Sequence, residues 1–203
     1  MKINVNYHSS IQINDVISID PLKIEKSFKA KYVFFTHSHW DHYSIEDTKK
    51  IVTTQTILIC PKTMEDEVKK TFKNKIIAVE PNKTYQDKDL KFETFASYNI
   101  GKPFHPKDNN WVGYILKIEN QRVAVVGDSD NTPDLQNIKT DILLIPIGGT
   151  YTMSAQEAAE ATNIIKPKKV IPTHYGEVVG NKEMANEFKN LLSPTIECEI
   201  LDF

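Results

Sequence analysis

The sequence has no long apolar run, few cysteines and almost no arginine. No stretch of its 203 residues approaches the roughly 18 to 20 consecutive apolar residues that a membrane-spanning helix needs. Two cysteines, Cys60 and Cys198, are too few for a small fold stapled by disulfides. A content of 40% hydrophobic residues is too high for a disordered chain. We therefore expect a folded protein with no membrane segment.

The scarcity of arginine bears on the possible partners. Arg122 is the single arginine among 25 basic residues, and 27 acidic residues bring the net charge to -2. Arginine is the residue that grips phosphates with two parallel hydrogen bonds and reads guanine edges. A nearly neutral chain with one arginine is a poor nucleic-acid binder, so we expect no such partner.

The N-terminal residues and the cysteine content indicate the compartment. Residues 1–7 alternate between polar and apolar side chains and do not form the apolar block of a secretory signal. Together with the two isolated cysteines, this pattern predicts a cytoplasmic protein. The sequence does not indicate an oligomeric state.

No repeat, low-complexity tract or flexible linker divides the chain, so we expect a single domain over residues 1–203. The first half is mainly β-strand in pattern, and the second half alternates strands with helices. The expected strands are 3–7, 11–13, 16–19, 32–35, 56–60, 76–79, 91–95, 112–118, 122–126, 142–147, 170–172 and 196–201, and the expected helices begin at Ser44 or span 64–72, 154–166 and 182–192. This order predicts an α/β fold of two packed sheets with helices outside, a four-layer αββα sandwich.

Three of the six histidines lie in one hexapeptide, His37-Ser38-His39-Trp40-Asp41-His42, directly after an apolar strand. His37 and His39 are two residues apart, so their side chains can project to the same side. Imidazole nitrogens are good zinc ligands, and Asp41 and His42 can turn towards a second ion nearby. The spacing predicts a metal-binding loop at the end of a strand.

Three further candidate ligands also lie next to apolar strands. His105 precedes the strand that begins near Trp111, Asp128 follows the strand 122–126, and His174 follows the strand 170–172. A sandwich can gather side chains from such distant segments along one rim. A single metal centre would then account for five of the six histidines.

With these residues in this order, the sequence resembles the metallo-β-lactamase superfamily, whose signature is His-x-His-x-Asp-His at a strand end. Within this superfamily, the sequence is more similar to one branch than to the others, the small, single-domain hydrolases that resemble L-ascorbate-6-phosphate lactonase. The stretches that carry this second resemblance are 7–10, 19–21, 146–153 and 170–176.

The resemblance implies a binuclear metal centre. Two divalent ions are expected, most simply zinc, with manganese or iron suited to the same ligands. A hydroxide between the ions would attack a small ester, lactone or phosphoester, and Asp41 would carry a proton to the leaving group. The implied ligands are His37, His39 and His105 for one ion, Asp41, His42 and His174 for the other, and Asp128 as a catalytic bridge between both.

Other functions on the same fold stay open. An iron-dependent oxidoreductase is one, although the di-iron relatives place a carboxylate where His39 stands and usually carry a flavin domain. A metal-dependent nuclease or phosphodiesterase is another, although such enzymes generally carry an inserted domain or a basic surface. A catalytically silent binding protein is the third, and the complete ligand set argues against it because buried, unused ligands are costly.

Several residues near the ligands have two interpretations. Asp20 either orients a liganding imidazole or forms a simple Asp-Pro turn. His8 is expected in the core or at the pocket edge and outside the ligand set. Gly148 and Gly149 either let the backbone approach the site or permit a turn. Trp40, Tyr43 and Tyr151 either line the pocket or serve packing. Lys107 either meets an anionic group of the substrate or lies in solvent.

Overall fold

The computed structural model describes residues 1–202, which form two compact units, Met1–Glu80 and Pro81–Asp202. Each unit contains one β-sheet, and the described chain holds five α-helices, so the predicted α/β composition is confirmed. The expectation of a single domain over residues 1–203 stays a prediction. Among the described residues, no helix has both the length and the apolar character needed to cross a membrane.

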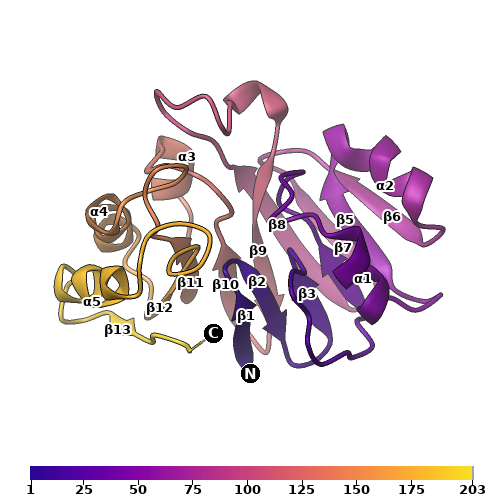
Figure 1. Cartoon of the computed structure of the whole chain (residues 1–203), viewed down its shortest axis with the longest axis horizontal. Helices are drawn as coiled ribbons and strands as arrows, with labels where there is room; N and C mark the ends of the chain where they lie inside the picture. Colours follow the sequence, from indigo (N-terminus) through magenta and orange to yellow (C-terminus); the bar gives the residue numbers. More distant parts are fainter. Residues whose placement is uncertain (203) are drawn as a thin grey trace. The chain divides into compact units, whose positions relative to one another are not determined.

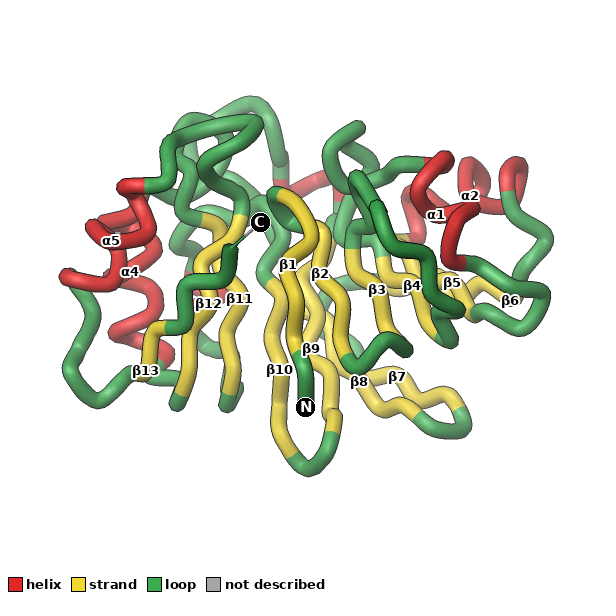
Figure 2. Tube along the Cα trace, turned by 60° about the horizontal axis from the view of Figure 1, so that its bottom comes forward, coloured by secondary structure: helices red, strands yellow, loops and turns green. Residues whose placement is uncertain are grey.

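The first unit contains a six-stranded sheet in the order β1 to β6 (Figures 1 and 2). Strands β1, β2 and β3 pair antiparallel, whereas β3, β4, β5 and β6 run parallel. The parallel strands β3 and β4 are short and fully buried, which agrees with the apolar sequence of β4, whereas β3 also buries the polar Ser18. The strands are β1 (Ile3–Tyr7), β2 (Ser10–Ile13), β3 (Ile17–Ile19), β4 (Tyr32–Phe34), β5 (Ile57–Pro61) and β6 (Lys75–Val79).

Two helices pack on this sheet, α1 (Ile45–Ile51) and α2 (Glu65–Thr71), the second preceded by the 3-10 turn η1 (Lys62–Met64) (Figure 1). The predicted helix start is confirmed, because the Ser44 hydroxyl accepts a hydrogen bond from the Asp47 amide at 3.2 Å. The core between helices and sheet consists of Ile24, Ala30, Val33, Phe35, Tyr43, Ile51, Leu58, Cys60, Met64, Val68 and Phe72.

The second unit contains a seven-stranded sheet in the order β13, β12, β11, β10, β9, β8, β7 (Figure 2). Neighbouring strands from β7 to β10 are antiparallel, and those from β10 to β13 are parallel. The strands are β7 (Thr84–Asp87), β8 (Leu90–Ala96), β9 (Val112–Ile118), β10 (Gln121–Val125), β11 (Ile142–Pro146), β12 (Lys169–Thr173) and β13 (Glu197–Cys198).

Three helices belong to the second unit, α3 (Pro133–Gln136), α4 (Ala155–Ile165) and α5 (Glu183–Asn190), together with the 3-10 turn η2 (Lys107–Asn109). Helix α4 contacts α3, α5 and β11 (Figure 1). It begins with the predicted capping box, in which Ser154 and Glu157 exchange hydrogen bonds with each other's backbone amides.

The structure differs from the sequence prediction at three elements. Strand β7 and the one-turn helix α3 were not predicted, because β7 has a polar sequence that only its hairpin partner β8 orders. Helix α3 depends on a cap by Thr132 rather than on an apolar pattern. The last strand is two residues long, since only Glu197 and Cys198 pair with β12.

Candidate metal centre

In the first unit, the strand directions bring three loops to one edge of the sheet. Strands β3 and β4 are parallel, so Asp20, after β3, and the hexapeptide 37–42, after β4, share the edge at their carboxyl ends. Strand β2 runs antiparallel to β3, so the turn at His8 that precedes β2 lies at the same edge. Residues far apart in sequence therefore meet there.

His37 and His39 present two imidazole nitrogens side by side. The distance from His37 Nε2 to His39 Nδ1 is 3.0 Å, and His37 is fully buried. With metal–nitrogen bonds of about 2.0–2.1 Å and tetrahedral angles, two ligating nitrogens lie about 3.3 Å apart. The spacing between the two nitrogens therefore fits ligation of one ion.

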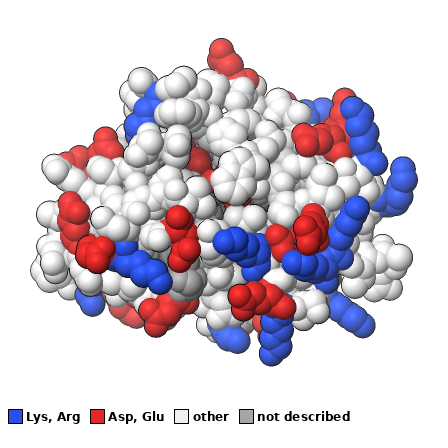
Figure 3. All heavy atoms as spheres, in the orientation of Figure 1, with Lys and Arg blue, Asp and Glu red and all other residues white. Residues whose placement is uncertain are grey.

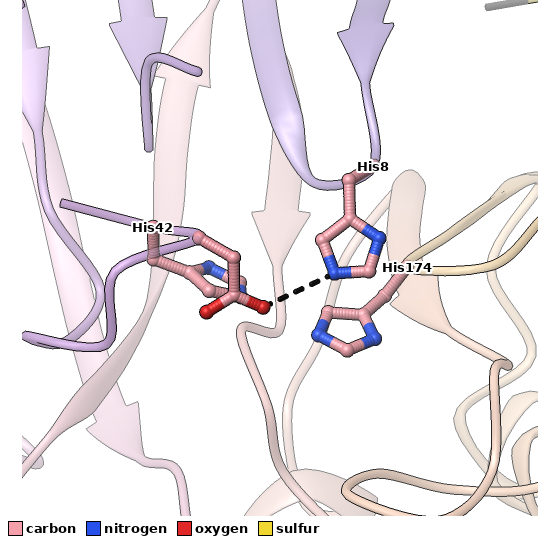
Figure 4. A group of neighbouring side chains, drawn as sticks. His8, His42 and His174 are labelled. Atoms are coloured by element: carbon pink, nitrogen blue, oxygen red, sulfur yellow. Dashed lines mark ion pairs between the residues drawn. The ribbon is translucent and has the colours of Figure 1, made fainter. Parts of the chain in front are cut away.

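Asp41 and His42 form a second group, and His8 joins it. His8 Nε2 lies 3.3 Å from Asp41 Oδ2, and His42 Nε2 lies 3.8 Å from the same oxygen. Figure 4 shows His8 and His42, with the contact from His8 to the Asp41 carboxylate dashed. One ligand atom from each of the three residues lies within 4.8 Å of the others. His8 is fully buried, in agreement with the core position given as one of its two expected places, and its contact with Asp41 is new.

Asp20 supports both groups of histidines. Its Oδ2 accepts hydrogen bonds from His42 Nδ1 at 2.8 Å and from the Thr36 hydroxyl at 2.5 Å, and its Oδ1 accepts from the Thr36 amide at 2.7 Å. Because that hydroxyl donates to Asp20, it accepts from His37 Nδ1 at 2.9 Å. Burial raises the pKa of the Asp20 carboxyl, and the hydrogen bonds from His42 and Thr36 oppose this rise. Both imidazoles are thereby left with Nε2 as the ligating atom.

In the second unit, three candidate ligands also converge on one edge. Asp128 follows β10 and His174 follows β12, whose carboxyl ends share an edge because β10, β11 and β12 are parallel. His105 lies in the loop after β8, which runs in the same direction as β10 because both are antiparallel to β9.

Asp128 lies beside both histidines of this edge. Its Oδ2 is 3.1 Å from His174 Nε2, and a carboxylate oxygen also lies within 4.8 Å of a His105 ring nitrogen. All three residues are at least 97% buried. A buried carboxylate beside two imidazoles supplies the mixed oxygen and nitrogen donors of a metal site.

The loop after β11 allows a close backbone approach to His174. A Cβ atom on Gly148 would lie 2.1 Å from the His174 carbonyl oxygen and 2.6 Å from Val179 Cγ2. His174 itself adopts a left-handed backbone conformation with φ of 58°. Of the two interpretations of Gly148, the structure therefore supports close approach.

The donor set fits a divalent metal. Each unit offers imidazole nitrogens and carboxylate oxygens, which are the donors that zinc, manganese and iron accept. The distances between these donor atoms are close to those between two ligand atoms on one ion. The first unit supplies His37, His39, Asp41 and His42, and the second unit supplies His105, Asp128 and His174. Their joint action on two ions stays a prediction.

Comparisons with known proteins decide the family. The family model described as a beta-lactamase superfamily domain matches residues 4–174. The chain belongs to the metallo-β-lactamase superfamily. It is 32% identical over 186 residues to a UPF0173 protein of Pyrococcus abyssi, which covers 90% of this chain and 82% of the relative. A UPF0173 metal-dependent hydrolase of Archaeoglobus fulgidus is 31% identical over 173 residues, covering 76% of this chain and 70% of that protein.

A solved structure supports the metallo-β-lactamase fold. The crystal structure of a Parabacteroides distasonis protein matches with a TM-score of 0.82 and 27% identity, covering 98% of this chain and 93% of that one. The α/β fold class predicted from the sequence is thereby confirmed. The finer resemblance to the lactonase branch stays a prediction.

The remaining neighbours of the metallo-β-lactamase motif have distinct roles. Tyr43 packs against Phe35 with ring centroids 5.0 Å apart, so it belongs to the core. Lys107 Nζ lies 3.5 Å from Asp134 and 4.4 Å from the centroid of the Tyr98 ring. Burial raises the pKa of the Cys60 thiol to about 12. Such a raised pKa is typical of a cysteine in the core and unlike that of a metal ligand.

We expect Asp20→Asn to weaken metal binding by about 10- to 100-fold, the usual effect of losing a residue that orients a ligand. The amide would turn an NH2 group towards Thr36 or His42, where the carboxylate accepts hydrogen bonds. Competition with a chelator of known affinity measures the change. Asp15→Asn, at an outlying turn of the same unit, is the matched control. Unchanged affinity in the Asp20 variant would contradict the orienting role.

His8→Ala should keep its metal stoichiometry and lose about tenfold in kcat/KM. His8 contacts Asp41, and the ligands themselves remain in place. Elemental analysis and steady-state kinetics measure the two quantities, and His8→Gln, which retains an N–H donor, should recover part of the activity. Loss of one ion in the alanine variant would make His8 a ligand and overturn the assignment.

Proposed function

We propose that the protein is a binuclear metal-dependent hydrolase acting on a small ester, lactone or phosphoester. The observation that carries this proposal is the buried Asp128 carboxylate, 3.1 Å from His174 and close to His105. The paired donors of the first unit, His37 with His39 and Asp41 with His42, support it.

The proposed ligand sets follow the superfamily resemblance. The two sets would share one carboxylate. His37, His39 and His105 would hold one ion, Asp41, His42 and His174 the other, and Asp128 would bridge them.

Two divalent ions held there would supply a water nucleophile of lowered pKa and polarise a carbonyl or phosphoryl oxygen of the substrate. Asp41 would carry a proton to the leaving group, and its contact with His8 would orient the carboxylate. Asp20 would hold His42 directly and His37 through Thr36. Zinc is the first candidate metal, and manganese or iron suits the same donors.

A small-molecule substrate suits the surface and the composition. On the face shown in Figure 3, acidic and basic side chains lie among one another rather than in separate fields. With a net charge of -2 and a single arginine, this mixture supports the expectation of no nucleic-acid partner. The free thiols Cys60 and Cys198 support the expected cytoplasmic location.

Metal content per chain tests the proposal, measured by elemental analysis on protein purified without a metal-binding tag. We expect two zinc or manganese ions and hydrolysis of at least one chromogenic ester, lactone or phosphodiester. Chelation should abolish activity and lower the melting temperature, because bound metal stabilises the folded state. Substantial iron would favour an oxidoreductase, and no metal after adding each ion back would overturn the mechanism.

A further inference from the structure

Three aromatic side chains are exposed among those that the structure describes, and two of them neighbour a proposed ligand in sequence. Trp40, 70% exposed, stands between His39 and Asp41 in sequence. Phe104, 41% exposed, directly precedes His105. The third, Tyr151, is 39% exposed. Exposed apolar side chains that form a contiguous surface mark binding sites, and ligand sites are lined mainly by apolar and aromatic residues.

In the second unit, Phe104 and Tyr151 form a defined pair. Their rings meet edge to face with centroids 4.8 Å apart and planes at 85°. This geometry is a favourable arrangement of two aromatic rings. The pair therefore presents a single apolar surface.

Hydrogen bonds tie this pair to the proposed ligands. The Asn99 side-chain amide donates to the carbonyl of Asp128 and to the carbonyl of Tyr151, both at 3.1 Å. The Asn99 backbone amide donates to the His105 carbonyl at 2.7 Å. One asparagine thus links the Tyr151 backbone, the His105 backbone and the Asp128 backbone, which holds the pair next to the ligands.

The cations of the same loop already have partners. Lys102 Nζ lies 2.7 Å from Asp130 Oδ1 and donates to the Thr152 carbonyl at 2.7 Å. Lys107 faces Asp134 and the ring of Tyr98. This loop therefore offers apolar contact more readily than it offers a positive charge for a phosphate.

We propose that Phe104 and Tyr151 bind an apolar substituent of the substrate, next to the bond that is hydrolysed. The preferred substrates are then esters, thioesters or lactones that carry an aliphatic or aryl group, and sugar phosphates are disfavoured. This inference rests on the proposed hydrolase function and adds its substrate class.

Binding of alkyl hydroxamates to the metal-loaded protein tests the inference without relying on turnover. The hydroxamate group binds metal, and its alkyl chain reports on apolar contact, so calorimetry is run from acetohydroxamate to octanohydroxamate. One fully buried methylene contributes about fourfold in affinity. Because the rings remain partly exposed, we expect a total gain of at least about tenfold along the series.

Variants of the two aromatic residues test whether their rings produce this gain in affinity. Phe104→Ala and Tyr151→Ala should keep the affinity for acetohydroxamate and each lose about fivefold for octanohydroxamate. Tyr151→Phe, which keeps the ring, should bind as the wild type does. Ile164→Ala is the control, because Ile164 is 52% exposed near the C-terminal end of α4, a helix that contains neither Phe104 nor Tyr151.

The outcomes separate this inference from the proposed function. If acetohydroxamate binds but affinity does not rise with chain length, or if glucose 6-phosphate binds more tightly than octanohydroxamate, the inference alone is overturned. A gain that survives in both alanine variants overturns it as well. If the metal-loaded protein binds no acetohydroxamate, both the proposed metal-centred function and this inference are overturned.

Discussion

Asp128→Ala should lose metal and activity together, with kcat/KM falling by about a thousandfold or more. Asp128 is 3% exposed, and its carboxylate lies 3.1 Å from His174 Nε2, in the position proposed to join both ions. Its removal would leave each ion one ligand short and release the constraint that holds the two together. Elemental analysis of the purified variant, paired with kinetics on a substrate that the wild type hydrolyses, measures both quantities.

Asp134→Asn is the matched control for this variant. Asp134 accepts a hydrogen bond from the Tyr98 hydroxyl at 2.9 Å and has no place in the proposed ligand set. It should retain both ions and near wild-type kcat/KM. Full activity of Asp128→Ala with two bound ions would refute the bridge.

Gly148→Ala should displace His174 although it adds a single methyl group. The new Cβ would lie 2.1 Å from the His174 carbonyl oxygen, far inside any real contact. The neighbouring Ile147 amide donates to the Thr173 carbonyl at 3.0 Å, so the two loops cannot separate without losing a hydrogen bond. We expect the free energy of unfolding to fall by about 1–3 kcal/mol, as in other overpacked sites. Denaturant unfolding measures this loss.

Metal content separates the effect on His174 from a general loss of stability. Gly148→Ala should bind less than its full complement of metal and lose about 100-fold in kcat/KM, because a misplaced ligand disturbs both. Gly101→Ala is the comparison, since φ is +73° there and nothing lies within 4 Å of the added Cβ. It should cost about 1 kcal/mol of stability and no metal. Normal metal content in the Gly148 variant would show that the loops relax around the methyl group.

The local parts of the site were predictable from the sequence because their determinants are local. The spacing of His37 and His39 after an apolar strand is enough to pair their imidazoles, now 3.0 Å apart. The Ser154 capping box likewise contains both of its partners within four residues. By contrast, nothing local connects Asp128 with His174, and grouping them required the superfamily resemblance.

His8 shows where prediction from sequence stops. It is a lone histidine after a strand, with no partner at metal-ligand spacing. Its contact with Asp41 arises from the order of strands β1 to β4, which brings the turn at His8 to the edge where β4 ends. Sheet order and register are long-range properties, so no pattern near His8 could have revealed the contact. The exposure of Phe104 and Tyr151 depends in the same way on how the loops fold.

The hydrogen bonds of Asp20 have a consequence for metal uptake. This one carboxylate holds His42 directly and, through Thr36, His37, which are proposed to bind different ions. An ion bound to either imidazole would also hold this carboxylate in the orientation that the other imidazole needs. Loading should therefore be positively cooperative, with singly occupied protein scarce at every stage of a titration.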